Sequence, residues 1–425
     1  MIRSRFAASL VAIGAASLVL AGCGNNDTAT EEEVATEEVV AAVEPNCAIG
    51  TLLPQTGNLA FLGPPEFAGV DLAVKQINEA GGINGEEIVH LVGDSGDTST
   101  DIASQTTDSH LANNVMAIVG AASSGVSLTV IDKITGANVV HFSPANTSPA
   151  LTEYEDNGFY FRTAPPDTFQ GAVLGGLVFD DGYDSAAILA LDDAYGTGLA
   201  DNFEKNFVEA GGTVTEKLIY NPQAAEFSAE VTAVKGSSPK AVVLIGFEET
   251  TKILQEMIKQ GVGPDKLPVY LVDGNLSSAA YADLPEGIMV GVKGTLPGTA
   301  TPDAVKEALL SVNPDLEDFS YAPESWDAVN LIALAAAAGG SCDGATVAAN
   351  LAAVSGANGG EKCTDYASCK KLLDEGKAID YEGLSGPVNF NEFGDPSVAT
   401  MGIYEYTAND KYEPIDFITG DVPKP

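Results

Sequence analysis

Small, hydroxyl-bearing residues follow two neighbouring apolar segments, and their types suit the binding of a small anion. Residues 121–124, Ala-Ala-Ser-Ser, follow the apolar run 117–119 and Gly120. Residues 143–148, Ser-Pro-Ala-Asn-Thr-Ser, follow the apolar run 139–142. Neither group contains arginine or lysine, so hydroxyl and backbone N–H groups would have to hold the anion. The two groups therefore form a candidate site for a small carboxylate.

The segment between the two groups has the spacing of a helix. Leu128, Ile131 and Ile134 recur at helical intervals, and the pattern ends at Gly136. A buried strand, a helix and a second buried strand form a β-α-β unit, and open α/β sheets bind ligands at the carboxyl ends of such strands. Both groups should therefore lie at the ligand-binding edge of one sheet.

The hydroxyl groups also suit the starts of helices. Ser123 or Ser124 is expected to cap one helix, and Thr147 or Ser148 another. A helix start offers unpaired N–H groups and a partial positive charge, which favour a bound anion. Ordinary capping explains either group alone better than a ligand does, but the occurrence of both in neighbouring turns favours a site.

The N-terminus has the features of an export signal. Arg3 and Arg5 precede the apolar stretch 6–20, which is short for a membrane span. Leu20-Ala21-Gly22-Cys23 resembles the bacterial lipobox, in which cleavage occurs before a cysteine that then carries lipid. We therefore predict a lipoprotein signal peptide at 1–22 and lipidation of Cys23. The alternative is a simple secretion signal followed by a chance cysteine.

Composition limits the partners of the rest of the chain. Residues 23–46 lack an apolar period and are rich in Asn, Thr, Ala and Glu, which predicts a lipid-anchored acidic linker. The chain has 20 basic and 60 acidic residues and a formal charge of −40, which argues against nucleic acid and anionic lipid surfaces as partners. The acidic residues are scattered, as on a solvated surface, and we interpret them as suited to a salty medium.

Four further cysteines predict disulfides, because an even number in an exported protein is typical of them. Cys363 and Cys369 are close in sequence and could close a small loop, which leaves Cys47 and Cys342. Metal binding is the alternative. There is no C-x-x-C pair, however, and His90, His110 and His141 are dispersed, so we expect neither a metal nor a cofactor.

Several ordered motifs resemble one family. The chain is similar, over roughly residues 48–410, to branched-chain amino-acid-binding proteins, the type I periplasmic solute receptors of ABC importers. The resemblance is carried by Gly57 and Phe61, by residues 67–69, 77–78 and 81–85, by the region near Ser124, and by residues 143–147, 161–163, 386–390 and 394–395.

The resemblance implies an α/β fold of two doubly wound parallel-sheet lobes joined by three crossover strands, as in type I periplasmic binding proteins. Lobe 1 would comprise residues 47–164 and 297–385, and lobe 2 residues 165–296 and 386–425. Within lobe 2 the apolar pattern predicts an edge strand at 288–292 and strands at 388–390 and 402–406.

The resemblance also assigns a zwitterion site. By position, Ser124 and Thr147 would give hydroxyl and N–H groups to the carboxylate, and the Ala145 carbonyl and the Thr147 hydroxyl would accept from the ammonium. Asp273 stands where the family places an acid, more often Glu, against that ammonium. A buried ammonium needs such a charged acceptor. Glu248 is a second candidate, although charge at a helix start explains it slightly better.

Ser123 and four aromatic residues complete the predicted site. Tyr195 matches an aromatic residue that closes over the ligand from the second lobe. Phe61, Phe247 and Trp326 would wall the ligand's side chain, and core packing is the alternative for each. Phe61 stands where Tyr is common in the family, which suits an apolar side chain.

The resemblance therefore implies a monomeric, extracytoplasmic, lipid-anchored receptor that binds a small amino acid, with a branched-chain residue favoured, and delivers it to the permease subunits of an ABC importer. Alternatives are an amide or urea receptor or a sensor of the same fold. Gly93-Asp94-Ser95-Gly96 resembles the loop around a serine-protease nucleophile, but no paired base is visible, so we interpret it as a turn and expect no enzyme.

Overall fold

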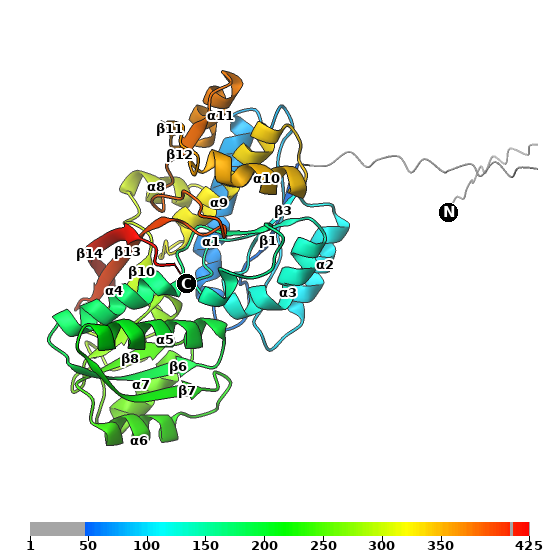
Figure 1. Ribbon diagram of the computed structural model, residues 1–425. Coiled ribbons are helices and arrows are strands. Elements are labelled where there is room, and N and C mark those ends of the chain that lie inside the picture. The colour runs from blue at the N-terminus through cyan, green and yellow to red at the C-terminus, as the bar shows by residue number, and fades with distance from the viewer. Residues whose placement is uncertain (1–46, 409–410, 425) are drawn as a thin grey trace, which may run out of the picture. The chain divides into compact units, whose positions relative to one another are not determined.

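Two separate sheets form the framework of the chain in the computed structural model, which describes residues 47–408 and 411–424 (Figure 1). The first sheet has five parallel strands in the order β2–β1–β3–β4–β5. The second has seven strands in the order β14–β13–β10–β9–β8–β6–β7. The predicted signal peptide, Cys23 and the linker up to residue 46 lie outside the described residues.

The first sheet is buried on both faces by helices. Ile49, Ala117 and Val119 pack in one core cluster with α1 and α9, and the intervening Ala48 and Ile118 pack in another with α2 and α3. Strand side chains alternate between faces, so a strand covered on both sides reads as a continuous apolar run. The elements are β1 (Ala48–Leu52), α1 (Gly63–Glu79), β2 (Val89–Leu91), α2 (Ile102–Ala112), β3 (Ala117–Gly120), α3 (Ser124–Gly136), β4 (Val140–Ser143) and β5 (Tyr160–Arg162).

A later segment of the chain returns to this sheet and completes what we call the first lobe. Its long helix α9 is buried along most of its length and packs on α1, where a Cβ at Gly69 would lie 2.3 Å from the Ala322 carbonyl oxygen. The elements are α8 (Asp303–Leu310), α9 (Ala322–Gly339), α10 (Gly344–Val354), β11 (Glu361–Cys363), α11 (Tyr366–Asp374) and β12 (Ile379–Tyr381).

Both predicted disulfides are present in the first lobe. Cys363 and Cys369 bridge the end of β11 to α11, across six positions of sequence. Cys47 and Cys342 join the residue before β1 to the segment between α9 and α10, across 295 positions. The second bridge closes a long loop, which in the chain-entropy account restricts the unfolded chain more than a short loop does.

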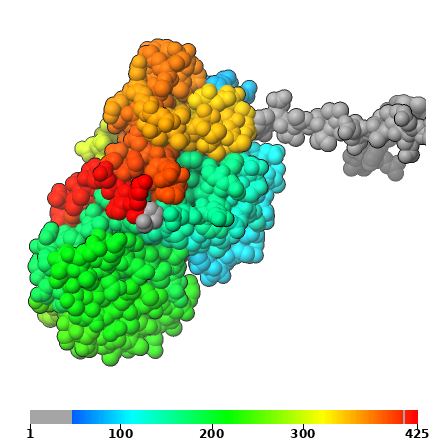
Figure 2. Space-filling model, viewed as in Figure 1, coloured from blue at the N-terminus to red at the C-terminus, as the bar shows by residue number. Residues whose placement is uncertain are grey.

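The second sheet and its helices form the second lobe. Strands β7, β6, β8, β9 and β10 are parallel, and β13 and β14 add to β10 in antiparallel pairs, so the C-terminal hairpin lies against the second lobe (Figure 2). The elements are α4 (Asp167–Asp180), β6 (Ser185–Leu191), α5 (Ala194–Glu209), β7 (Thr213–Tyr220), α6 (Ser228–Ser237), β8 (Ala241–Ile245), α7 (Thr250–Lys259), β9 (Val269–Leu271), β10 (Lys293–Pro297), β13 (Val398–Tyr406) and β14 (Tyr412–Asp421).

The structure confirms the predicted two-lobed α/β class and corrects two strands. Residues 288–292 form turns, with Val290 51% exposed, and the strand begins only at Lys293. That strand is not at the edge, because β13 covers it. Residues 388–390 form no strand of the second sheet. Val388 and Phe390 pack instead in the core of the first lobe, and Phe390 makes only an isolated bridge with Pro396.

The crossings between the lobes are tied by a buried ion pair. The Arg162 Nε atom lies 2.6 Å from the Asp395 Oδ1 atom, and both side chains are at most 1% exposed. Arg162 ends β5 at the first crossing, whereas Asp395 precedes β13 at the third. Because residues 388–390 belong to the first core, we now propose that lobe 2 resumes near residue 397 and not at 386.

Within residues 47–408 and 411–424, no single helix is both long and apolar enough to cross a membrane. Only α9 and α10 together would meet those criteria, and their axes are bent 105° apart.

Candidate functional site

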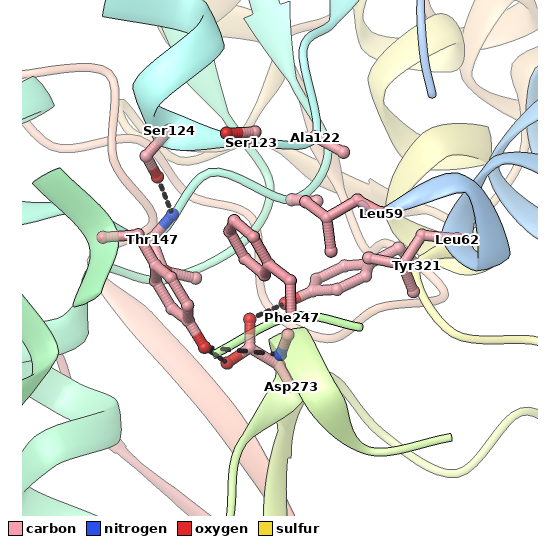
Figure 3. A pocket seen from close by; sticks show the side chains of 12 residues that line it. Leu59, Leu62, Ala122, Ser123, Ser124, Thr147, Phe247, Asp273 and Tyr321 are labelled. Atoms are coloured by element: carbon pink, nitrogen blue, oxygen red, sulfur yellow. Dashed lines mark hydrogen bonds between the residues drawn. The ribbon is translucent and has the colours of Figure 1, made fainter. Parts of the chain in front are cut away.

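The carboxyl ends of strands from both sheets meet at one small cavity (Figure 3). Loops after β3 and β4 reach it from the first lobe, and loops after β6, β8 and β9 reach it from the second. Its free space is about 10 Å³, room for about one water molecule. The lining residues are Leu59, Leu62, Ala122, Ser123, Ser124, Ala145, Thr147, Tyr195, Phe247, Asp273, Gly274 and Tyr321.

The two hydroxyl-rich loops of the first lobe bond directly to each other. Ser123 caps α3, since its side chain accepts the Val126 N–H at 3.3 Å. The Ser124 Oγ atom accepts the N–H groups of Thr147 at 3.3 Å and of Ser148 at 3.2 Å (Figure 3). This leaves the Ser124 hydroxyl proton free to donate to a ligand.

A polar network beneath the loops fixes their shape. The Ser143 hydroxyl donates to the Ala121 carbonyl at 2.6 Å and accepts the N–H groups of Ala145 and Asn146. The Asn146 amide donates to the carbonyls of Ala121 and Ala122 at 2.9 Å each. Small side chains and satisfied buried polar groups make these loops a rigid wall.

One part of the predicted anion site is wrong. Ser148 caps only the short 3-10 turn η2 (Pro149–Leu151), not an α-helix, because the chain turns at Thr152 and leads towards β5. A single turn has no appreciable dipole, so only α3 presents a helix N-terminus to the cavity. The second loop contributes hydroxyl and backbone groups without that charge.

Two buried polar groups beside this wall have no hydrogen-bond partner in the described residues. One is the Thr147 hydroxyl, and the other is the carboxylate of Asp167, whose side chain is fully buried at the start of α4. Burial raises the pKa of Asp167 well above its usual value, the charge of Asp273 raises it further, and the neighbouring Thr147 hydroxyl opposes the rise although the two groups form no hydrogen bond. The Asp167 N–H donates to the Thr147 carbonyl at 2.6 Å, which links α4 to the second loop.

The second lobe supplies an acid held by three donors. Asp273 opens the 3-10 turn η3 (Asp273–Asn275) after β9. Its Oδ1 atom accepts from the Tyr195 hydroxyl and the Gln170 amide at 2.8 Å each, and its Oδ2 atom accepts from the Tyr321 hydroxyl at 2.7 Å. Burial raises the pKa of Asp273, and these three hydrogen bonds oppose the rise.

Aromatic rings line the space between the two polar sides. The rings of Tyr195 and Phe247 stack with centroids 5.5 Å apart and planes 4° apart. Figure 3 shows Phe247 between the Thr147 and Leu59 sides of the cavity. The lobes also touch there, because the Ser148 hydroxyl donates to the Ala194 carbonyl at 2.7 Å and the Glu248 N–H to the Asn58 carbonyl at 3.3 Å.

The cavity brings together most of the predicted site residues: Ser123, Ser124, Ala145, Thr147, Tyr195, Phe247 and Asp273. Their roles towards a ligand stay predictions. Phe61 lies in a separate, larger cavity, and Glu248 is exposed. Trp326 packs in the first core and donates to the Gln76 side chain at 2.8 Å, so core packing accounts for it.

Sequence reasoning missed several residues of the site. Tyr321 is not among the predicted residues; it precedes α9 with a φ of 60° and directs its hydroxyl to Asp273. Gln170 reaches Asp273 from α4, a contact without a local sequence signal. Leu59 and Leu62 lie in the loop after β1, two residues from the predicted Phe61 or closer.

The protease-like motif is a turn. The Asp94 Oδ1 atom accepts the N–H groups of Gln55 and Thr56 at 3.0 and 3.1 Å, and its Oδ2 atom accepts the Thr56 hydroxyl at 2.6 Å. The Ser95 hydroxyl donates to the neighbouring Gly96 carbonyl. In the part of the chain that the structure describes, no cluster of three or more His, Cys, Asp or Glu side chains could hold a metal ion.

Comparison with known proteins agrees with this architecture. The profile of the periplasmic binding protein family matches residues 47–400. A Leu/Ile/Val-binding protein homolog of Brucella abortus is 28% identical over 377 residues, 86% of this chain and 92% of that protein. The substrate-binding protein BasB of a chemotactic signal transduction system in Halobacterium salinarum is 28% identical over 358 residues, 82% of this chain and 84% of that protein.

A solved structure shares the fold. The branched-chain amino acid transporter substrate-binding protein LivJ of Streptococcus pneumoniae, in complex with isoleucine, superposes with a TM-score of 0.72 at 23% identity, over 88% of this chain and 100% of that one. Family membership implies an extracytoplasmic location. With its two α/β lobes and a polar cavity where their strands end, the chain belongs to the periplasmic binding protein family.

Proposed function

We propose that the chain is an extracytoplasmic receptor that binds the zwitterion of an α-amino acid between its lobes for uptake by an ABC importer. One observation carries the proposal: anion-binding groups and a buried acid face the same cavity from opposite lobes. Ser124 and Thr147 lie on the first lobe, and Asp273 lies on the second. This separation of charge complements a carboxylate and an ammonium on one small molecule.

Each end of the zwitterion has a partner in this proposal. The carboxylate accepts from the Ser124 hydroxyl at the N-terminus of α3 and from the Thr147 hydroxyl, which has no other partner in the described residues. The ammonium donates to Asp273, whose three present donors do not exhaust a carboxylate's acceptor capacity. Leu59, Leu62 and Phe247 offer an apolar wall that suits a branched aliphatic side chain.

Ligand entry requires the lobes to separate. The cavity has room for about one water molecule, far less than an amino acid occupies. Because each lobe supplies part of the contacts, a ligand would favour the closed form by the difference between its contacts in the closed and open forms. The direct contacts between the lobes, such as Ser148 to Ala194, would add to the stability of the closed form.

Calorimetry with L-leucine, L-isoleucine and L-valine tests the proposal. We expect binding by the wild type and losses of roughly 10-fold for Thr147→Val and roughly 100-fold or more for Asp273→Asn, because a charged hydrogen bond is worth more than a neutral one. Glu248→Gln is the control, since Glu248 is exposed, and should bind as the wild type does. Unchanged affinity in both test variants would overturn the assignment.

Anchoring and the absence of catalysis belong to the same proposal. We infer that cleavage before Cys23 leaves a lipidated, monomeric receptor at the membrane surface, with no enzymatic activity. Mass spectrometry of the chain expressed with its leader should show a lipid on Cys23. A Cys23→Ser variant should be released into the soluble fraction.

A sensory role is the second candidate, favoured by the similarity to the chemotactic substrate-binding protein of Halobacterium salinarum. The acidic composition agrees with a salty medium. Uptake and sensing would share the same ligand site, so calorimetry does not separate them. Neighbouring genes for two permeases and two ATPases would favour uptake.

A further inference from the structure

A second and much larger cavity lies between the lobes, beside the amino-acid cleft. Its volume is about 530 Å³. Its lining residues come from the loop after β1, the crossing after β10, the segment before α9 and the β13–β14 hairpin. Tyr321 lines both cavities, and its hydroxyl is bonded to Asp273. The proposed zwitterion site does not use this space.

Aromatic side chains form much of the wall of the larger cavity. They come from both lobes: Phe61, Phe319, Tyr321, Tyr404 and Tyr412. The rings of Tyr404 and Tyr412 meet edge to face with centroids 5.4 Å apart. The faces of such rings attract cations. The Lys306 ammonium already shows this, because it lies 5.7 Å from the centroid of the Phe319 ring.

A buried acid also faces this cavity. The Glu324 side chain lines it while the residue is only 2% exposed. Among residues 47–408 and 411–424, no other residue donates a hydrogen bond to its carboxylate or forms an ion pair with it. The carboxylate comes so close to the chain that a Cβ at Gly298 would lie 2.2 Å from Oε1.

A second unpartnered acid interacts with Glu324. Glu66, near the start of α1, is fully buried, and neither of its oxygens has a hydrogen-bond partner in the described residues. Burial raises the pKa of Glu66 well above its usual value, and the charge of Glu324 contributes to the rise. Two buried acids without a cation are costly to ionise, and a positive group brought to Glu324 would relieve that cost.

We propose that the larger cavity binds an organic ammonium group, with its charge against the Glu324 carboxylate and its apolar body against the aromatic rings. The ammonium has two possible sources. It is either the far end of a ligand whose amino-acid head lies in the first cleft, which would deepen the proposed function, or a separate molecule. Because Tyr321 lines both cavities, one ligand could extend from the amino-acid cleft into the larger cavity.

Calorimetry with phenethylammonium chloride tests the site without relying on the amino-acid cleft. We expect binding by the wild type, at least 10-fold weaker binding by Glu324→Gln, and weaker binding by Tyr404→Leu, which removes a ring but no charge. Glu79→Gln, at an exposed acid that lines neither cavity, is the charge-matched control and should leave the affinity unchanged. The neutral analogue 2-phenylethanol should bind at least 10-fold more weakly than the ammonium.

Competition distinguishes the two sources. If one ligand spans both cavities, L-arginine should bind the wild type and lose affinity in both Glu324→Gln and Asp273→Asn. If the molecules are separate, phenethylammonium should bind Asp273→Asn and the wild type equally, and saturating L-leucine should not displace it.

Equal binding of phenethylammonium by the wild type and Glu324→Gln, with Glu324→Gln shown to be folded by its thermal melt, would overturn the inference. So would equal binding of 2-phenylethanol and phenethylammonium. If no amino acid binds but phenethylammonium does, the proposed function fails and the second site stands.

Discussion

Buried carboxylates at the crossings between the lobes have hydrogen-bond or ion-pair partners, whereas some other buried carboxylates have none in the described residues. At the crossings, Asp395 accepts from Arg162 Nε at 2.6 Å and from the Thr152 hydroxyl at 2.8 Å. Asp327 accepts from Tyr381, from the Leu384 N–H and twice from Ser385. Every one of these contacts joins segments distant in sequence.

Other buried carboxylates are less well satisfied. Neither carboxylate oxygen of Asp167 or of Glu66 has a hydrogen-bond partner in the described residues. Asp273 has three donors but no cation. Unpaired buried charge destabilises a fold, whereas the paired acids hold the crossings together.

The largest expected effect is at the crossing. Asp395→Ala leaves the Arg162 guanidinium buried without its counter-charge, so we expect a loss of about 3–5 kcal/mol in the free energy of unfolding. Urea unfolding followed by circular dichroism measures it. Asp374→Ala, which breaks the exposed pair with Lys370 on α11, should cost no more than about 0.5 kcal/mol. Similar losses in the two variants would mean that the buried pair at the crossing contributes no more to stability than an exposed pair does.

The sequence did not predict much of this contrast between buried carboxylates. It did predict β-α units, because apolar runs bounded by glycine and by capping residues mark them, as in Ala117–Gly120 followed by Ser123. The same logic marked the two hydroxyl-rich loops with Ser123, Ser124 and Thr147. The resemblance to the family supplied the other predicted residues that share the cavity, which are Ala145, Tyr195, Phe247 and Asp273.

Contacts between distant segments were the part that the sequence could not supply. Nothing local to Tyr321 or Gln170 shows that both reach Asp273. Arg162 and Asp395 are separated by 233 positions, and each alone resembles a surface charge. Phe61 matched a family position, but the loop after β1 carries it into the larger cavity and Leu59 and Leu62 into the cleft.

An intermediate effect is expected at Glu324 and depends on pH. Burial raises the pKa of Glu324 from 4.5 to about 8 in the folded state. Between these values the folded state keeps a proton that the unfolded state releases, so the wild type loses stability as pH rises. Glu324→Gln lacks this loss. Its stability relative to the wild type should grow by about 1.4 kcal/mol per pH unit across that window.

Urea unfolding at pH 5, 6 and 7 gives that slope, and the exposed Glu317→Gln provides the baseline. Other titrating groups cancel in the difference between each variant and the wild type. If the stability difference between Glu324→Gln and the wild type does not change with pH, burial does not raise the pKa of Glu324 in the wild type.

The smallest expected effect is at Asp167, beside the amino-acid cleft. Burial, followed by the charge of Asp273, raises the pKa of Asp167, so the folded state again retains a proton that the unfolded state loses as pH rises. Asp167→Asn should therefore be more stable than the wild type at pH 8, by about 1 kcal/mol, and equal to it near pH 4. Asp180→Asn, at the exposed end of the same helix, is the control and should change neither value. If Asp167→Asn is destabilising at pH 8, the Asp167 carboxylate is satisfied in the fold.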